Sequence, residues 1–448
     1  MSTVTRIPSI DAAPARDAAG IGGHPRGLTT LFFTEFWERF SYYGMRAILV
    51  LYMAAPASQG GLEFDTAKAT SIYGTYTMSV YLTSLPGGWL ADRVFGARLA
   101  VLLGGITIAL GHFAMAVDSM TFFYGGMILI AIGTGLLKPN ISTMVGGLYG
   151  ADDSRRDAGF SIFYMGINLG GMVAALVCGY LGQRVNYHVG FAAAGVGMVL
   201  GLIQYVAHRK RLESVGARRQ VARAKTANAL KEPLTAQEKK KLFVIGFLFL
   251  FSILFWTAFE QSGSSLNLFA ARQTRNSIFG YEFPSSWLQS VNSFFILTLA
   301  PAFAWLWARW GKRQPSSPAK FSFALLSVGA GLIVIAIAGS LTGSGKVSPM
   351  WLVALYFIHT VGELCLSPVG LSTVTKLAPA RMVGLMMGVW FLSIAIGNKL
   401  AGWAAGFYRD EASALFRLYA GLAAAALAGA VTLALLTPFI RRLIGRAD

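Results

Sequence analysis

The chain has 448 residues, of which 55% are hydrophobic and only 13% are charged. A soluble globular protein carries roughly twice that charged fraction, so the composition excludes an ordinary soluble domain and indicates a protein of the lipid bilayer. The net charge of +18 would suit a nucleic-acid-binding protein. However, eleven of the 38 lysines and arginines lie in segment 209–241, and most others flank apolar stretches. This distribution is typical of a membrane protein and argues against a nucleic acid partner.

Twelve stretches are apolar and, at about 20 residues or more, long enough to cross a bilayer as helices. The polar segment 209–241 divides them into two sets of six. We therefore predict a cytoplasmic N-terminal tail (1–27), an N-terminal six-helix bundle (28–208), a basic cytoplasmic linker (209–241), a C-terminal six-helix bundle (242–440) and a cytoplasmic tail (441–448). The predicted spans are residues 28–53, 69–91, 97–117, 121–145, 159–181, 189–207, 242–268, 286–308, 319–341, 349–376, 382–407 and 413–440.

The orientation follows from the positive charges. With the N-terminus inside, the inner segments hold 27 lysines and arginines and the outer loops hold 7. Cytoplasmic segments of membrane proteins carry the excess of positive charge, so we expect both termini in the cytoplasm. The linker 209–241 either lies along the inner leaflet, with a short amphipathic helix, or is solvated.

The first span contains three charged residues within five positions. Glu35, Glu38 and Arg39 are three and four residues apart, so they share one helical face. Each charge at bilayer depth costs about 2.5–3.5 kcal/mol before any pairing, so such residues face water, a partner or a ligand. The span is therefore predicted to be the working surface of a transporter or pump.

Further charges occur in other spans. The acidic residues Glu35, Glu38, Glu260 and Glu363 are balanced by Arg39, Arg46, Lys138 and Lys399. Mutual neutralisation in a low-dielectric cavity requires such a balance. Purely structural ion pairs are the alternative, and Lys399 can instead extend to the outer surface.

A weak internal repeat supports the division into halves. The fourth span contains PNIST from Pro139, and the tenth span, at the corresponding position of its half, contains PVGLST from Pro368. Matched proline-interrupted helices indicate a binding region between repeats, although the pattern is short enough to arise by chance.

Three motifs carry a resemblance to a known family. Residues 34–44 (TEFWERFSYYG) resemble the ExxERFxYYG motif of the proton-dependent oligopeptide transporters, and residues 163–170 (FYMGINLG) resemble that family's second signature. Residues 88–98 (GWLADRVFGAR) resemble the loop between helices 2 and 3 of the major facilitator superfamily. The resemblance implies an all-α membrane protein with the major facilitator fold, in which twelve transmembrane helices form two six-helix bundles around a central cavity. Linker 209–241 is too short for the two extra helices found in many bacterial members.

The resemblance also implies a function and a location. A bacterial member is expected to be a multi-pass protein of the inner membrane that imports di- and tripeptides with protons by alternating access. Glu35, Glu38 and Arg39 match the family's proton-coupling cluster, to which Lys138 and Glu260 contribute. The pairs Arg46–Glu260 on the outer side and Lys138–Glu363 on the inner side match its gating salt bridges, which protonation and peptide binding release.

The expected substrate contacts follow from the two charged ends of a peptide. Arg46 and Lys138 match cations for the carboxylate, with Tyr42 and Asn168 nearby, whereas Glu363 and Asn292 match partners of the ammonium. Aromatic rings that match the lining of the family's site can accept many side chains. These aromatic residues are Tyr43, Tyr81, Trp256 and Trp390.

Two other interpretations remain open from the sequence. Plant branches of the family carry other solutes, such as nitrate and hormones, although the intact charged residues favour peptides. A membrane-embedded enzyme would need a nucleophile–base pair or a metal cluster, and the sequence contains neither pattern. We therefore expect a monomeric transporter without catalytic residues, metal or cofactor, with H+ as its coupling ion.

Overall fold

The computed structural model describes residues 17–150, 153–216 and 233–444. Every predicted span coincides with one helix or with two consecutive ones. The first half contains α1 (Arg26–Ala54), α2 (Thr66–Leu82), α3 (Ser84–Leu90), α4 (Ala97–Met115), α5 (Met120–Gly147), α6 (Arg156–Tyr180) and α7 (Tyr187–Ala207). The second half contains α9 (Ala236–Phe259), α10 (Ser265–Arg272), α11 (Ser290–Trp310), α12 (Ser317–Ser340), α13 (Met350–Leu377), α14 (Val383–Ala405) and α15 (Ala412–Ile444).

Ten helical segments of the described chain are long and apolar enough to cross a membrane. Neither α1 nor α2 is among them. In α1 the reason is chemical, because this helix carries Glu35, Glu38, Arg39 and Arg46, all of which are buried. A helix whose charges face the protein interior can cross a bilayer although its mean composition is too polar.

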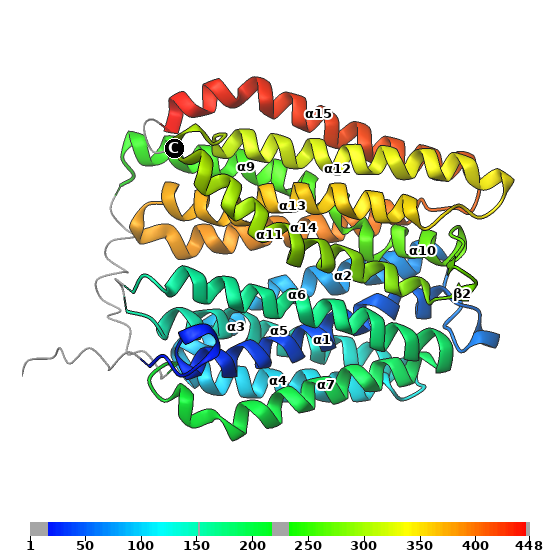
Figure 1. The fold of residues 1–448 in the computed structure, drawn as a ribbon, viewed down its shortest axis with the longest axis horizontal. Helices are drawn as coiled ribbons and strands as arrows, with labels where there is room; N and C mark the ends of the chain where they lie inside the picture. The colour runs from blue at the N-terminus through cyan, green and yellow to red at the C-terminus, as the bar shows by residue number, and fades with distance from the viewer. Residues whose placement is uncertain (1–16, 151–152, 217–232, 445–448) are drawn as a thin grey trace, which may run out of the picture.

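The helices form two bundles that lie side by side (Figure 1). In the first bundle α1 packs against α6 and α7, and α4 packs against α5; in the second, α12 packs against α13 and α15. This arrangement is the predicted major facilitator fold. The all-α prediction needs one amendment, because the loop between α10 and α11 contains a hairpin of β1 (Ser277–Ile278) and β2 (Tyr281–Glu282). Its two-residue turn, Phe279 and Gly280, has positive φ at both positions, as tight hairpins require.

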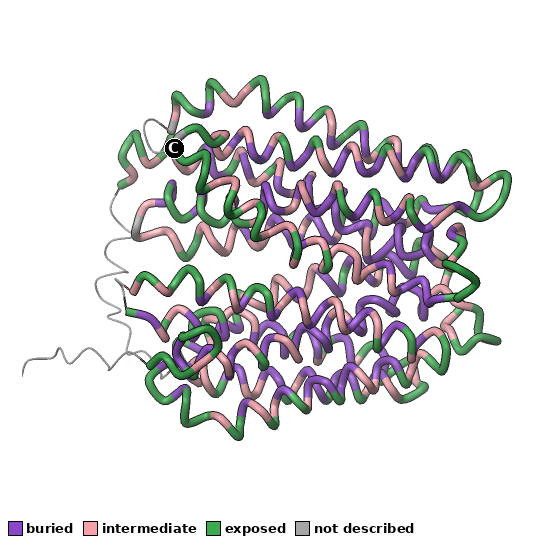
Figure 2. The backbone as a smooth tube through the Cα atoms, in the orientation of Figure 1, coloured by how far each residue is buried: buried purple, intermediate pink, exposed green. Residues whose placement is uncertain are grey.

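The bundles meet mainly at one end. There α2 packs against α14, α6 against α11, and α1 against α10. Buried backbone runs along the interior of each bundle and continues across this end, near α10 and α2 (Figure 2). We call it the closed end; the opposite end is the one at which α1 begins and α15 finishes.

Parts of the predicted tails and linker lie outside the described residues. They are 1–16 of the N-terminal tail, 217–232 of the linker, and 445–448, so the amphipathic helix expected in the linker stays a prediction. The described end of the linker leads into α9 through a capping box, in which Thr235 accepts from the Glu238 backbone N–H and the Glu238 carboxylate accepts from that of Thr235. This pattern fixes where the second bundle begins.

Candidate functional site

A central cavity of about 210 Å³ lies between the two bundles. Both bundles contribute to its wall, and most of the wall residues are aromatic, amide or acidic. The first bundle supplies Tyr43, Tyr81, Tyr164, Asn168, Gly171 and Ala175, and the second supplies Trp256, Phe259, Glu260, Ser262, Gln289, Asn292, Ser293, Ile296, Tyr356, Glu363 and Ser367.

The charged cluster of α1 is buried beside this cavity. Arg39 lies 3.2 Å from Glu35, measured from Nε to Oε1, and also pairs with Glu38. Glu35 Oε2, Glu38 Oε1 and Arg39 Nη2 are buried and have no hydrogen-bond partner among the described residues. Buried polar atoms are normally satisfied, so these three atoms mark a place where protonation or a ligand can change the local balance.

A second buried ion pair joins the two bundles. Arg46 of α1 pairs with Glu260, and the Arg46 Nε–H donates to the Tyr73 hydroxyl. Glu260 is buried and lies where α9 ends, at the start of the 3-10 turn Glu260–Gly263 that separates α9 from α10. Such discontinuous helices commonly form binding and coupling sites in transporters. The structure thus places these two residues in the contact expected for the outer side.

Neutral hydrogen bonds reinforce the same end. Asn267 of α10 donates to the Ala47 carbonyl at 2.8 Å, and Gln289 donates to the same oxygen at 3.3 Å. The Trp287 indole N–H donates to the Leu176 carbonyl at 3.0 Å. These bonds hold the second bundle against the backbone of the first.

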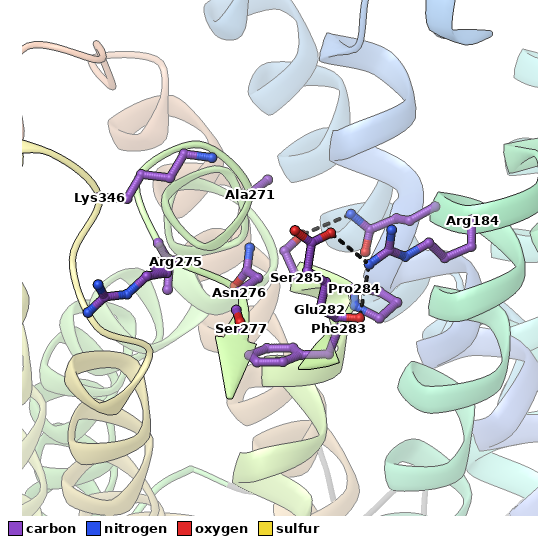
Figure 3. A pocket seen from close by; sticks show the side chains of 12 residues that line it. Arg184, Ala271, Arg275, Asn276, Ser277, Glu282, Phe283, Pro284, Ser285 and Lys346 are labelled. Atoms are coloured by element: carbon purple, nitrogen blue, oxygen red, sulfur yellow. Dashed lines mark hydrogen bonds and ion pairs between the residues drawn. The ribbon is translucent and has the colours of Figure 1, made fainter. Parts of the chain in front are cut away.

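The hairpin and the residues after it also form hydrogen bonds with the first bundle at the closed end. Gln183, in the π-helical turn Leu181–Val185, donates to Ser285 at 2.9 Å and accepts from the Ser286 backbone at 3.0 Å. Arg184 points toward Glu282 (Figure 3) and donates to its carbonyl at 3.0 Å. The hydrogen bonds and ion pairs that the structure describes between the bundles gather in this half of the molecule.

The predicted pair of Lys138 with Glu363 is not formed. Lys138 Nζ lies 4.1 Å from the centroid of the Tyr81 ring, within the first bundle. Glu363 Oε2 accepts instead from Asn292 at 3.2 Å, within the second bundle, and Asn292 also donates to Thr360 at 2.9 Å. The contact is absent from this conformation because the bundles are joined at the closed end, which does not bring Lys138 of α5 to Glu363 of α13, and the pair stays a prediction.

Six of the ten expected substrate contacts line the cavity, and four do not. Arg46 and Lys138 each lie over a tyrosine of the wall, Arg46 at 5.9 Å from the Tyr43 ring centroid. Tyr42 is buried with its ring 5.1 Å from the Arg39 guanidinium. The six that line the cavity are Tyr43, Tyr81, Asn168, Trp256, Asn292 and Glu363.

Trp390 is the clearest departure from the expected lining. Its ring packs inside the second bundle, edge-on to Phe321 with a centroid distance of 5.9 Å. It also fills the space that Gly370 leaves by lacking a side chain. Trp390 is therefore a core residue in this conformation.

Ten of the 17 wall residues were not predicted, and for three of them the spacing in the sequence carried a signal. Tyr164 precedes Asn168 by four residues, Gln289 precedes Asn292 by three, and Tyr356 precedes Glu363 by seven. Residues at these spacings share a helical face. A search one or two turns before each predicted polar contact would have found them.

Two bundles that close at one end around a charged central cavity define a secondary transporter of the major facilitator type. In the described ranges no three His, Cys, Asp or Glu side chains group closely enough to hold a metal ion. Comparison with known proteins identifies the family. The POT family model matches residues 98–230 and 207–419, and the chain belongs to this family.

Similar proteins span nearly the whole chain. The uncharacterized transporter YclF of Bacillus subtilis is 42% identical over an alignment of 491 positions, gaps included, that covers 99% of both chains. A di-/tripeptide transporter of Lactococcus lactis subsp. cremoris is 40% identical over 432 residues, covering 83% of this chain and 87% of its own. A crystal structure of a mutant of the peptide transporter POT in complex with alafosfalin matches with a TM-score of 0.89 and 43% identity, covering 95% of this chain and 97% of the other.

Proposed function

We propose that the protein is a symporter that imports di- and tripeptides together with protons by alternating access. Two observations support this function: the similarity to the di-/tripeptide transporter of Lactococcus lactis and the mixed acidic, amide and aromatic wall of the cavity. The buried carboxylates near the cavity supply candidate proton carriers that need no cofactor.

We place the transporter in the bacterial inner membrane as a monomer, with both termini in the cytoplasm. The excess of positive charge in the predicted inner segments, 27 against 7 in the outer loops, supports this orientation. The bundles 28–208 and 242–440 would then rock against each other about the cavity, connected by the linker 209–241. The closed end faces outward, so the conformation described above is inward-facing.

The two ends of a peptide find opposite charges in this site. Glu363, which Asn292 orients, receives the N-terminal ammonium. Arg46 and Lys138, behind Tyr43 and Tyr81, attract the carboxylate. Glu363 and the two cations lie at a fixed separation, so both charged ends of a short peptide can reach them and those of a longer peptide cannot. The aromatic wall accepts many different side chains.

The observation that carries the coupling mechanism is the ion pair of Arg46 with Glu260 between the bundles. Protonation removes the negative charge of Glu260, and the attraction that holds this part of the outer end is lost. Glu35, Glu38 and Arg39 form a second protonation centre beside the cavity, from which the proton leaves on the cytoplasmic side. Lys138 and Glu363 would approach when the inner end closes, which makes their contact a property of the opposite conformation.

Uptake of a labelled dipeptide into liposomes with an imposed pH gradient tests this function. The wild-type protein should accumulate the dipeptide when the outside is acidic, and unlabelled di- and tripeptides should compete. The variant Glu260→Gln should retain exchange of dipeptide across the membrane but lose uphill uptake. Glu282→Gln, at an exposed carboxylate of the closed end, is the matched control and should keep both. Unchanged accumulation by Glu260→Gln would rule out the coupling role, and no competition by peptides would rule out the substrate class.

A further inference from the structure

A second, larger cavity lies in the C-terminal bundle at the end opposite to the closed end. It measures about 900 Å³ and is bounded by the end of α11, the start of α12, α13 and the last turns of α15. Three helices each place one cation on its wall, namely Lys320 of α12, Lys376 of α13 and Arg441 of α15. The other described wall residues are polar or apolar, and none of them is acidic. The cavity is therefore a basic chamber whose charge is complementary to an anion.

The chamber is preorganised around Lys320. This side chain is 7% exposed, donates from Nζ to Gln314 at 2.6 Å, and lies 4.2 Å from the centroid of the Trp307 ring. The N-terminus of the 24-residue helix α12 opens on the same chamber, and its N-cap residue Ser316 makes no side-chain cap hydrogen bond. The positive end of a helix adds to the attraction for an anion.

An apolar groove continues from this chamber along the outside of the bundle. It has a volume of about 330 Å³, runs between α12 and α15, and shares Ala319 and Thr437 with the chamber. Its other wall residues include the exposed side chains of Phe323, Leu326 and Val431. From position 319 to 326 the helix rises by about 10 Å, so the groove leads from the membrane surface toward its middle.

A polar anion site joined to a membrane-facing apolar groove has the shape of a phospholipid site. We propose that an anionic phospholipid binds here, with its phosphate in the basic chamber and one acyl chain in the groove between α12 and α15. With the orientation proposed above, the lipid belongs to the inner leaflet, where basic pockets between helices recognise anionic headgroups. A free phosphate ion could bind in the chamber, but it would leave the apolar groove empty, so the joined groove favours a phospholipid.

Native mass spectrometry of the purified full-length protein tests the site through lipid retention, independently of transport. The probes are phosphatidylglycerol, zwitterionic phosphatidylcholine and inorganic phosphate. Arg441→Gln should lower retention of phosphatidylglycerol about fivefold, the effect of one arginine beside an anionic headgroup. Arg442→Gln removes the adjacent arginine, which does not line the chamber, and should retain the lipid as the wild type does.

A second variant separates the lipid from a free anion. Ala434→Phe places a ring in the groove at an exposed position and leaves the three cations in place. It should displace phosphatidylglycerol and leave retention of inorganic phosphate unchanged. Selective loss of phosphatidylglycerol in Arg441→Gln and Ala434→Phe supports the proposal. Equal retention of phosphatidylglycerol by Arg441→Gln and Arg442→Gln would overturn the proposal. It would also be overturned if inorganic phosphate bound and Ala434→Phe left the retention of phosphatidylglycerol unchanged.

Discussion

The closed end depends on a close approach of α2 and α14 that a single methyl group should disrupt. A Cβ atom added at Gly402 would lie 2.5 Å from the Thr70 carbonyl oxygen and 2.7 Å from the Gly74 Cα atom. Both neighbours are backbone atoms, so the helices must separate to accommodate Gly402→Ala. Overpacking of this kind costs about 1–3 kcal/mol. In the proposed alternating-access mechanism the cost arises only while this end is closed, so the equilibrium should shift toward the outward-facing state by about 5- to 150-fold.

Distances between spin labels on the two bundles measure this shift. Labels at Ser58 and Ser344 would sit on exposed connections at the closed end of each bundle, in a variant without the two native cysteines. Gly402→Ala should increase the population with a long distance between the labels. The control is Gly421→Ala in α15, where an added Cβ has no neighbour within 4 Å. It changes helix propensity equally in both conformations and should leave the distances unchanged.

Identical distance distributions for the two glycine variants would refute this reasoning. They would mean that α2 and α14 adjust to the methyl group without separating, or that this contact persists in both conformations. The prediction also requires that Gly402→Ala still folds, because the overlap should disappear when the closed end opens. If only Gly402→Ala, and not Gly421→Ala, failed to fold, the prediction would be wrong.

Three further substitutions test other contacts of the site and the fold. Gly263→Ala would overlap the Tyr73 hydroxyl, which contacts Arg46, so it should reduce dipeptide uptake and lower stability by about 1–3 kcal/mol in thermal unfolding; full uptake would contradict the tight packing. Asn292→Leu removes the hydrogen bond to the Glu363 carboxylate and should weaken dipeptide binding about tenfold in a competition assay. The binding of an N-acetylated dipeptide, which lacks the ammonium group, should not change. Thr235→Ala removes the N-cap of α9 and should cost about 1 kcal/mol of stability, with normal uptake.

Much of the architecture could be read from the sequence because lipid imposes simple rules. The apolar runs located the membrane-spanning segments of the described chain, and the charged face of α1 indicated the buried cluster. The break after Phe259 was not predicted, because the run 242–268 contains no proline and its turn signal, residues 260–265 (EQSGSS), was read as part of one span. It depends on tertiary contacts of Gln261, which donates to the Ala401 carbonyl of α14 and accepts from Ser265.

Trp390 and the pair of Lys138 with Glu363 show why contacts in the site cannot be inferred from chemistry alone. Trp390 suits a substrate cavity, but the space above Gly370 directs its ring into the core of the bundle. Lys138 and Glu363 have opposite charges in corresponding helices of the two halves, yet in this conformation each interacts within its own bundle. Sequence identifies the partners, whereas the relative position of the bundles decides which of them meet.

The hydrogen bonds from Asn267, Gln289 and Trp287 all end on main-chain carbonyls of the opposite bundle. An amide oxygen does not titrate in the physiological range, and every amino acid provides one. These hydrogen bonds therefore keep the same strength in acidic and neutral surroundings, and in the proposed mechanism the response to protons falls to the ion pair of Arg46 with Glu260. The acceptor oxygens belong to the main chain, so a substitution at Ala47 or Leu176 that fits the packing leaves these hydrogen bonds in place.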